Sequence, residues 1–154
     1  MRDRVAEFAG MIVQAPDGSK VERYDRERTL AAYAEIDADA DCRCGNCRNY
    51  RSAFDMSRMD ASLLAACELL GIDPNKALEI VPHAFDAESS LLLYHGHYPF
   101  FGTVVDEPAS SGSAEWYFSC FTTGSARITR DAVELGFFVQ LPWVLPEKHD
   151  WQDG

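Results

Sequence analysis

The pattern of apolar residues changes near residue 85, and this change constrains the fold of the chain more than any other feature of its sequence. Before that point, apolar residues recur with the spacing of amphipathic helices. After it, runs of β-branched and aromatic residues alternate with glycine, serine and proline, as is typical of strands joined by turns. The 154 residues are enough for one hydrophobic core. We therefore predict a single α+β domain over 1–154, with helices of the N-terminal half packed on a small antiparallel sheet from the C-terminal half.

The first part of the chain predicts a hairpin followed by a helix. Two short extended pieces flank the turn residues Pro16, Asp17 and Gly18. Residues 25–36 then show helical periodicity. The face expected to be apolar consists of Leu30, Tyr33 and Ala34.

Two further helices are predicted between the cysteine-rich segment and residue 82. For residues 60–71, Asp60 can cap the helix and Gly71 can end it. Its apolar face consists of Leu63, Cys67 and Leu70. For residues 73–82, Asp73 can act as the cap, with a proline at the first helical position. Together these segments predict a helix pair.

The second half predicts strands at 90–94, 100–105, 115–121 and 137–141. In the third of these, Trp116, Phe118 and Cys120 fall on one side, because successive side chains of a strand alternate.

The charge balance is strongly acidic, with a net charge of −11 and an isoelectric point near 4.6. Acidic surfaces repel phosphates and anionic lipids, so we expect neither a nucleic acid nor a membrane as partner. No apolar run is long enough to span a bilayer, and residues 1–13 lack the pattern of a signal peptide. We therefore expect a soluble, cytoplasmic protein.

Three cysteines, Cys42, Cys44 and Cys47, lie within six residues. They are too close together to staple a fold, and in a reducing compartment such a cluster favours metal or thiol chemistry. The spacing between Cys44 and Cys47 lets two sulfur atoms face one point, as Zn²⁺ requires. The cluster therefore predicts a zinc site with three thiolate ligands.

A fourth zinc ligand has to come from elsewhere in the chain. His97 and Cys120 are the best candidates by residue type, and His83, His95 and Cys67 are weaker ones. Cys67 is the poorest, because a cysteine on the apolar face of a helix is usually a small core residue. With a ligand from the second half, the metal would tie the helices to the sheet, and its removal would loosen the whole domain.

A redox role is the main chemical alternative. Cys44 would attack a disulfide and Cys47 would resolve the intermediate, as in proteins with a Cys-x-x-Cys motif at a helix start. Here an acidic stretch precedes the motif in place of a buried strand, which weighs against this interpretation. Thiols with no role beyond a local turn are a further alternative.

The other short motifs point to no chemistry of their own. His95 and His97 resemble the paired histidines that bind metals from one strand, but packing or surface histidines are the commoner case. The acidic residues at 37–41 do not match a calcium-binding loop. Nucleophile elbows, phosphate-binding loops and dinucleotide fingerprints are absent from the sequence.

Four segments together resemble a family of small, uncharacterised bacterial proteins. The pattern joins Cys-x-Cys-x-x-Cys-Arg-Asn-aromatic, here residues 42–50, to a Leu-Gly-Ile-Asp-Pro junction at 70–74. A Tyr-x-Gly-x-Tyr-x-Phe-x-Gly stretch follows at 94–102, and Pro-Trp-Val-Leu lies at 142–145. The resemblance implies no activity, but it implies that these segments belong to one fold.

The chain departs from that family pattern at one position. A histidine follows the second tyrosine of the aromatic stretch in the family, where this chain has Pro99. If that histidine is a metal ligand in the family, His97 or His95 would replace it here.

From the sequence we therefore expect a small zinc-binding domain without catalysis of its own, which binds a protein partner. Cys42, Cys44 and Cys47 would be ligands, with His97 or Cys120 completing the shell. The alternatives are the thiol–disulfide redox protein and an acidic inhibitor or antidote that covers a basic site on another protein.

Overall fold

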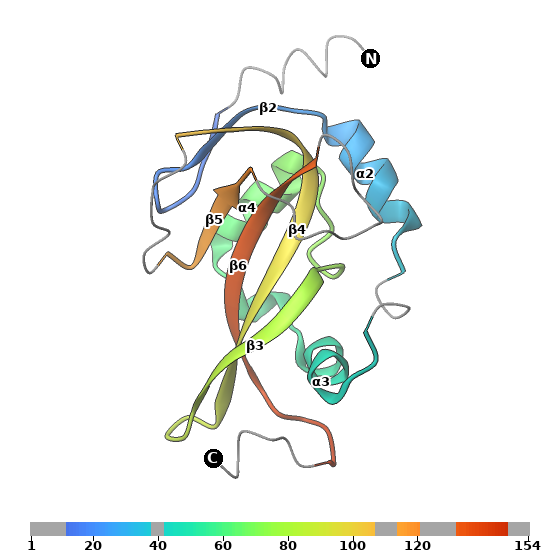
Figure 1. Ribbon diagram of the computed structural model, residues 1–154, viewed down its shortest axis with the longest axis vertical. Helices are drawn as coiled ribbons and strands as arrows, with labels where there is room; N and C mark the ends of the chain where they lie inside the picture. The colour runs from blue at the N-terminus through green and yellow to red at the C-terminus, as the bar shows by residue number, and fades with distance from the viewer. Residues whose placement is uncertain (1–11, 38–41, 107–113, 121–131, 148–154) are drawn as a thin grey trace.

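The computed structural model describes residues 12–37, 42–106, 114–120 and 132–147, and the fold is given for these residues. The elements are β1 (Val13–Gln14), β2 (Lys20–Tyr24), α2 (Arg26–Glu35), α3 (Gly45–Ala53), the short 3₁₀ helix η2 (Met56–Arg58), α4 (Ala61–Leu70), β3 (Leu78–Asp86), β4 (Leu91–Val105), β5 (Trp116–Ser119) and β6 (Ala132–Pro142). The described α-helices precede residue 71, and most of the antiparallel sheet follows it. The predicted α+β class is thereby confirmed (Figure 1).

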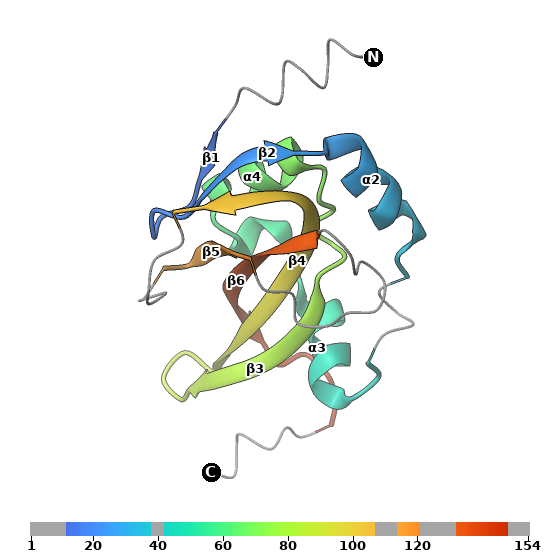
Figure 2. The same ribbon diagram turned by 45° about the horizontal axis from the view of Figure 1, so that its top comes forward.

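The long strand β4 organises the sheet. Its strand order is β1-β2-β4-β6-β5, and β3 also pairs with β4. All the pairings are antiparallel. β6 runs along β4 over residues 91–101, whereas β3 pairs with residues 91–97 and β2 with residues 102–105. β4 bends between these pairings, so β2 and β3 lie at opposite ends of the molecule (Figures 1 and 2).

Helix α2 lies along the stretch of β4 that neither β2 nor β3 reaches. There the Tyr33 hydroxyl donates to the carbonyl oxygen of Pro99 at 2.8 Å. The backbone N–H of Phe101 donates to Thr29 Oγ1 at 3.1 Å, and its carbonyl accepts from Asp25 N at 2.9 Å. Two side chains of α2 and the backbone N–H of its cap residue thus satisfy backbone groups of β4 that a neighbouring strand would otherwise pair. Pro99 fits here because it has no N–H that needs a partner.

The core lies between α3, α4 and one face of the sheet, and Figure 1 shows α4 behind β4 and β6. The Trp116 indole N–H donates to Ser62 Oγ on α4, and the Tyr98 hydroxyl donates to the carbonyl of Pro74 just after it. Large buried side chains of this face are Leu92, Tyr94, Tyr98, Phe100, Phe118, Leu135, Phe137 and Leu141. Alternation along each strand places the remaining side chains on the opposite face.

The helix predicted at 60–71 is confirmed with both of its end signals. Asp60 caps α4 by accepting from the backbone N–H of Ser62 at 2.8 Å. Gly71 ends it with φ at +84°, a left-handed conformation that favours glycine. Its predicted apolar face is buried, with Cys67 fully enclosed.

The helix predicted at 25–36 forms as α2, but the predicted face is only partly right. Thr29 and Tyr33 are the buried residues, whereas Leu30 is 42% exposed and Ala34 is exposed as well. Thr29 faces inward because its hydroxyl oxygen accepts a hydrogen bond from the backbone N–H of Phe101 in β4.

The helix predicted at 73–82 is wrong. Asp73 closes a turn by accepting from the backbone N–H of Asn75 at 3.0 Å, and residues 78–86 form β3. A cap residue followed by proline fits a turn as well as a helix start. Pairing with β4, which includes Val81 opposite His95, decides for the strand.

The strands at 90–94 and 100–105 were predicted separately but form one strand, β4, because β6 pairs with it without a break. The hairpin forms as β1 and β2, and 137–141 lies within the longer β6. β5 covers 116–119 of the predicted 115–121, whose residue 121 lies outside the described residues.

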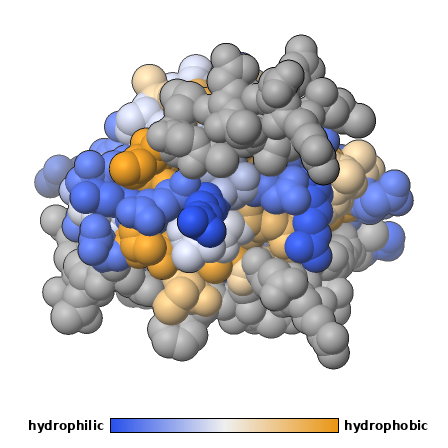
Figure 3. All heavy atoms as spheres, turned by 90° about the horizontal axis from the view of Figure 1, so that it is seen from above, coloured by the Kyte–Doolittle hydropathy of each residue, from blue (hydrophilic) through white to orange (hydrophobic). Residues whose placement is uncertain are grey.

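Hydrophilic side chains cover much of the described surface at the end that carries β2 and α2, with hydrophobic patches between them (Figure 3). Among the described helices, none combines the length and the apolar character needed to cross a bilayer. Residues 1–11 and 38–41, on which the signal-peptide and calcium-loop arguments partly rest, lie outside the described residues. The cytoplasmic location stays a prediction.

Candidate metal centre

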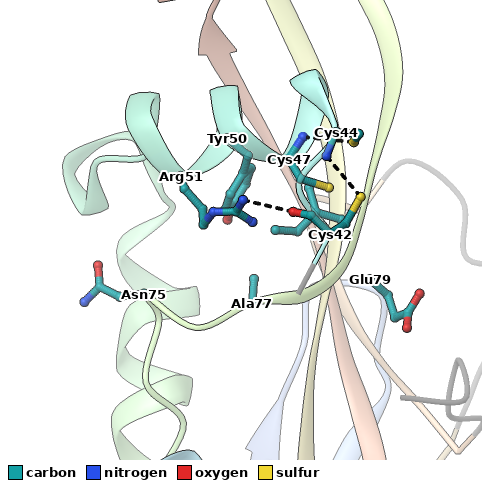
Figure 4. A pocket seen from close by; sticks show the side chains of 9 residues that line it. Cys42, Cys44, Cys47, Tyr50, Arg51, Asn75, Ala77 and Glu79 are labelled. Atoms are coloured by element: carbon teal, nitrogen blue, oxygen red, sulfur yellow. Dashed lines mark hydrogen bonds between the residues drawn. The ribbon is translucent and has the colours of Figure 1, made fainter. Parts of the chain in front are cut away.

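The three clustered cysteines meet at the start of α3, a helix that the sequence did not predict. Cys44 is its N-cap, and its Sγ accepts from the backbone N–H of Cys47 at 3.5 Å. Cys42 Sγ accepts from the backbone N–H of Cys44 at 3.4 Å. The three Sγ atoms lie within 4.8 Å of one another, so the cluster could hold a metal ion (Figure 4).

Two arginines of α3 hold the preceding loop against the helix. Arg51 donates from its guanidinium to the carbonyl oxygen of Cys42 at 2.9 Å, and Arg48 donates from Nε to that of Arg43 at 3.0 Å. Arg48 also forms an ion pair with Glu147 at 2.7 Å. These contacts bring Cys42 back beside the helix start, where both it and Cys44 are exposed. Figure 4 shows the Arg51 contact at the edge of the site.

Asn49 fixes α3 to the sheet two residues after the last cysteine. Its side chain is fully buried and donates to the Tyr94 hydroxyl and to the carbonyl of Pro142, each at 3.1 Å. It accepts from the backbone N–H of Val144 at 2.7 Å. Tyr94 in turn donates to the carbonyl of Asn46 at 3.1 Å. The cysteine turn is therefore held by the fold itself.

The thiols of Cys44 and Cys47 differ in their environment. Partial burial opposes ionisation of Cys44, but hydrogen bonds from the backbone N–H of Cys47 and from the neighbouring thiols outweigh it, so its pKa lies below the usual value. Cys47 is buried, and burial together with the thiols of Cys44 and Cys42 raises its pKa well above the usual value. Without a metal, Cys44 is thus the more readily ionised of these two.

A cavity of about 350 Å³ lies beside the sulfur atoms, between α3 and the start of β3. The residues lining it are Cys42, Cys44, Cys47, Tyr50, Arg51, Asn75, Ala77, Glu79 and Ile80. The Glu79 carboxylate points away from the cysteines in Figure 4. Glu79 has a φ of 52°, at the point where the β3 pairing with β4 is irregular. The irregular start of β3 forms one wall of this cavity.

The other predicted ligands lie elsewhere. Tyr94 and Tyr98 point toward the helices, and His97 lies at an odd-numbered position between them, so its side chain points to the face of β4 opposite α3. Cys120 is exposed just beyond β5, which β6 separates from β4. Cys67 is enclosed in α4. The structure thus brings together Cys42, Cys44 and Cys47, but not His97 or Cys120. Coordination by any of these residues stays a prediction.

Arg48 can be expected from the sequence to offset thiolate charge, but sequence reasoning missed Arg51 and Asn49 as supporting residues of the centre. Arg48 and Arg51 are three residues apart, as one helix face requires, but the segment has too few apolar residues to be read as a helix. The buried role of Asn49 depends on Tyr94 and Pro142, which lie far away in the sequence.

Comparisons with protein-family models, with curated proteins and with solved structures find no match for this chain. The resemblance based on the four segments therefore stays a prediction. The geometry of the cysteines and their surroundings is the basis on which a function can be assigned.

Proposed function

We propose that this chain is a zinc-binding domain without catalysis of its own, in which Cys42, Cys44 and Cys47 hold one Zn²⁺. The mutual distances of the sulfur atoms, none above 4.8 Å, carry the proposal. With Zn–S bonds of about 2.3 Å, the sulfur atoms of a tetrahedral site are roughly 3.8 Å apart. A contraction of at most about 1 Å, within one short segment, would complete the three-thiolate set.

Nearby positive charge supports the proposal. Three thiolates and one Zn²⁺ carry a net negative charge, and the N-terminus of a helix favours negative charge beside it. Cys44 caps α3, and the guanidinium groups of Arg48 and Arg51 lie against the same loop. Both features would stabilise the ionised thiols.

The fourth ligand position would face the cavity beside α3. Because Cys42 and Cys44 are exposed, a side chain of a protein partner could reach the ion, and water would occupy the position otherwise. We therefore propose a partner-binding role for this end of the molecule.

The position of the ligands changes the structural effect expected of the metal. All three lie between residues 42 and 47, and Asn49 already holds α3 to the sheet. The ion would order the loop and the first turn of α3, and its removal would not unfold the sheet. This is a narrower effect than the sequence predicted.

Native mass spectrometry of protein purified without added metal tests the proposal. We expect a mass excess of one Zn²⁺ that a strong chelator removes, and its loss in Cys44→Ser. Cys120→Ser is the matched control, because this exposed cysteine lies outside the cluster and should keep the ion. Unmetallated protein with free thiols, after incubation with one equivalent of Zn²⁺, would contradict the proposal.

A thiol–disulfide role is the second candidate, and one observation favours it. Cys44 is exposed at the helix start while Cys47 is buried behind it, as an attacking and a resolving thiol would be. The Cys44 thiolate would attack a substrate disulfide and release one substrate thiolate. Cys47 would then attack Cys44, forming the Cys44–Cys47 disulfide and releasing the second, so that the substrate is reduced by two electrons.

The two functions predict different states of the cysteines: bound to zinc in one case, and able to form a Cys44–Cys47 disulfide in the other. A redox protein incubated with a disulfide-containing peptide should lose two hydrogens, with both Cys44 and Cys47 protected from alkylation. Cys47→Ser should trap the mixed disulfide at Cys44. A metallated protein that leaves the peptide oxidised would eliminate this candidate.

A further inference from the structure

A second group of chemically active side chains lies on the sheet face opposite the helices. His95 and His97 are two residues apart on β4, and their ring centroids are 4.5 Å apart. Tyr117 of β5 approaches them across β6, and its hydroxyl lies 2.7 Å from His95 Nε2. His83 of β3 lies farther out, with its ring centroid 6.4 Å from that of His95. Three strands therefore bring imidazole and phenol groups together on this face.

The backbone of β6 is shaped to let Tyr117 reach His95. Tyr117 and His97 are both paired with Gly136, one on each side of β6. A Cβ atom at Gly136 would lie 2.3 Å from Tyr117 Cζ and 2.5 Å from its hydroxyl oxygen. The phenol ring therefore covers the site of a side chain at residue 136, and any Cβ there would have to displace it. Phe138 stacks on His95 with centroids 4.4 Å apart and holds the imidazole from the next position of β6.

One polar atom of this cluster lacks a partner. His97 Nδ1 is buried and makes no hydrogen bond to any of the described residues. Buried polar atoms are nearly always paired, and an exception calls for an explanation, such as a bound ion. In the tautomer in which His95 Nε2 donates to Tyr117, the other nitrogen of His95 also keeps a free lone pair. Among the described residues, two neighbouring imidazoles can thus each offer a nitrogen lone pair to a ligand.

The ring spacing and the charge both suit a cation. Two imidazoles bound side by side to one ion, with metal–nitrogen distances of about 2.1 Å, place their ring centres roughly 4.5–5 Å apart. The observed 4.5 Å falls in that range. Glu134 lies on the same face of β6, opposite Pro99 and Ser119, and is only 4% exposed. Burial, followed by the charge of Glu134, raises the pKa of Tyr117, so this carboxylate acts electrostatically on the cluster.

We propose that His95 and His97 form a second metal-binding site, independent of the cysteines, for a divalent transition metal that prefers imidazole ligands, such as Cu²⁺ or Ni²⁺. Tyr117 is the positioning residue. By accepting the Nε2 proton of His95, it fixes the tautomer and the ring orientation, as partners of metal-bound histidines commonly do. The proposal does not depend on zinc binding by the cysteines.

Electron paramagnetic resonance of a Cys42→Ser, Cys44→Ser, Cys47→Ser variant titrated with Cu²⁺ tests this site without thiol ligands. We expect one Cu²⁺ per chain with hyperfine splitting from two imidazole nitrogens. Adding His95→Gln or His97→Gln should weaken binding at least 100-fold, and Tyr117→Phe about tenfold. His83→Gln is the matched control and should bind as the parent does. Binding that survives His95→Gln, or no stoichiometric binding, would overturn the proposal.

A second measurement covers the case in which the serine variant does not fold. Wild-type protein already holding one equivalent of Zn²⁺ is titrated with Ni²⁺ while the imidazole resonances are followed by NMR. Broadening of the His95 and His97 signals before the rest of the spectrum supports the site. Unchanged imidazole signals at tenfold excess of Ni²⁺ would overturn it.

Discussion

Asn49 donates a hydrogen bond to the Tyr94 hydroxyl at 3.1 Å, and this contact joins the cysteine-bearing helix α3 to the central strand β4. The same amide also contacts Pro142 and Val144 after the last strand, so one buried side chain links three segments. A change at Asn49 should therefore affect both the stability of the fold and the position of the cysteines.

Asn49→Ala should destabilise the protein by about 2–4 kcal/mol, because the Tyr94 hydroxyl, the Pro142 carbonyl and the Val144 backbone N–H each lose the hydrogen bond that the buried Asn49 amide makes to them. It should also weaken Zn²⁺ binding at the cysteines about tenfold, since the turn is no longer held in place. Urea unfolding and competition with a zinc chelator measure the two effects. Ser52→Ala, at an exposed position of the same helix, should change neither.

Tyr33→Phe should cost about 1–3 kcal/mol, because the carbonyl oxygen of Pro99 loses the hydroxyl that satisfies it. Tyr24→Phe is the matched control, since the buried Tyr24 hydroxyl has no hydrogen-bond partner in the part of the chain that the structure describes. Removing that hydroxyl should leave stability unchanged or raise it. Equal losses in the two variants, measured as shifts in the denaturation midpoint, would show that α2 does not complete the edge of β4.

Gly136→Ala should destabilise the protein by about 1–3 kcal/mol, because the added methyl group overlaps the Tyr117 ring. It should also break the contact between Tyr117 and His95. Gly45→Ala provides the comparison. A Cβ there would meet its nearest neighbour at 3.7 Å, and the change should stay within about 1 kcal/mol. Calorimetric melting of both variants decides whether the glycine of β6 is required.

His95 should make stability depend on pH in chelator-treated protein. Burial, followed by the charges of His97 and His83, lowers its pKa from 6.5 to about 4. Between these values the unfolded chain binds the proton and the folded chain does not. The free energy of unfolding should therefore fall as the pH drops from about 6.5 to about 4, and His95→Gln should flatten that slope. An NMR titration of the His95 ring with a midpoint near 6.5 would refute this account.

How far the sequence predicts the fold depends on how local the signals are. Asp60 and Gly71 lie next to the helix they delimit, and both ends of α4 follow from them. Asp73 gives the same kind of signal, yet it closes a turn, because β4 pairs with the residues that follow. The pairing joins residues as far apart in the sequence as Leu78 and His97, and a short window of sequence does not contain both partners.

In the candidate site, too, the features set by neighbouring residues could be predicted and those set by distant residues could not. The spacing of Cys42, Cys44 and Cys47 was enough to predict that they meet. Helix α3 was missed because its burial depends on Asn49 and not on a run of apolar residues. The face of β4 on which His97 lies could not be known before the register with β6 was seen. For that reason the sequence could not place His97 away from the cysteines.

X-ray absorption at the zinc edge, on protein reconstituted with one equivalent of Zn²⁺, identifies the atoms that bind the ion. Three sulfur neighbours at about 2.3 Å are the predicted result, with Cys44→Ser losing one of them and Cys120→Ser keeping all three. A first shell made of nitrogen and oxygen alone would contradict zinc binding by Cys42, Cys44 and Cys47.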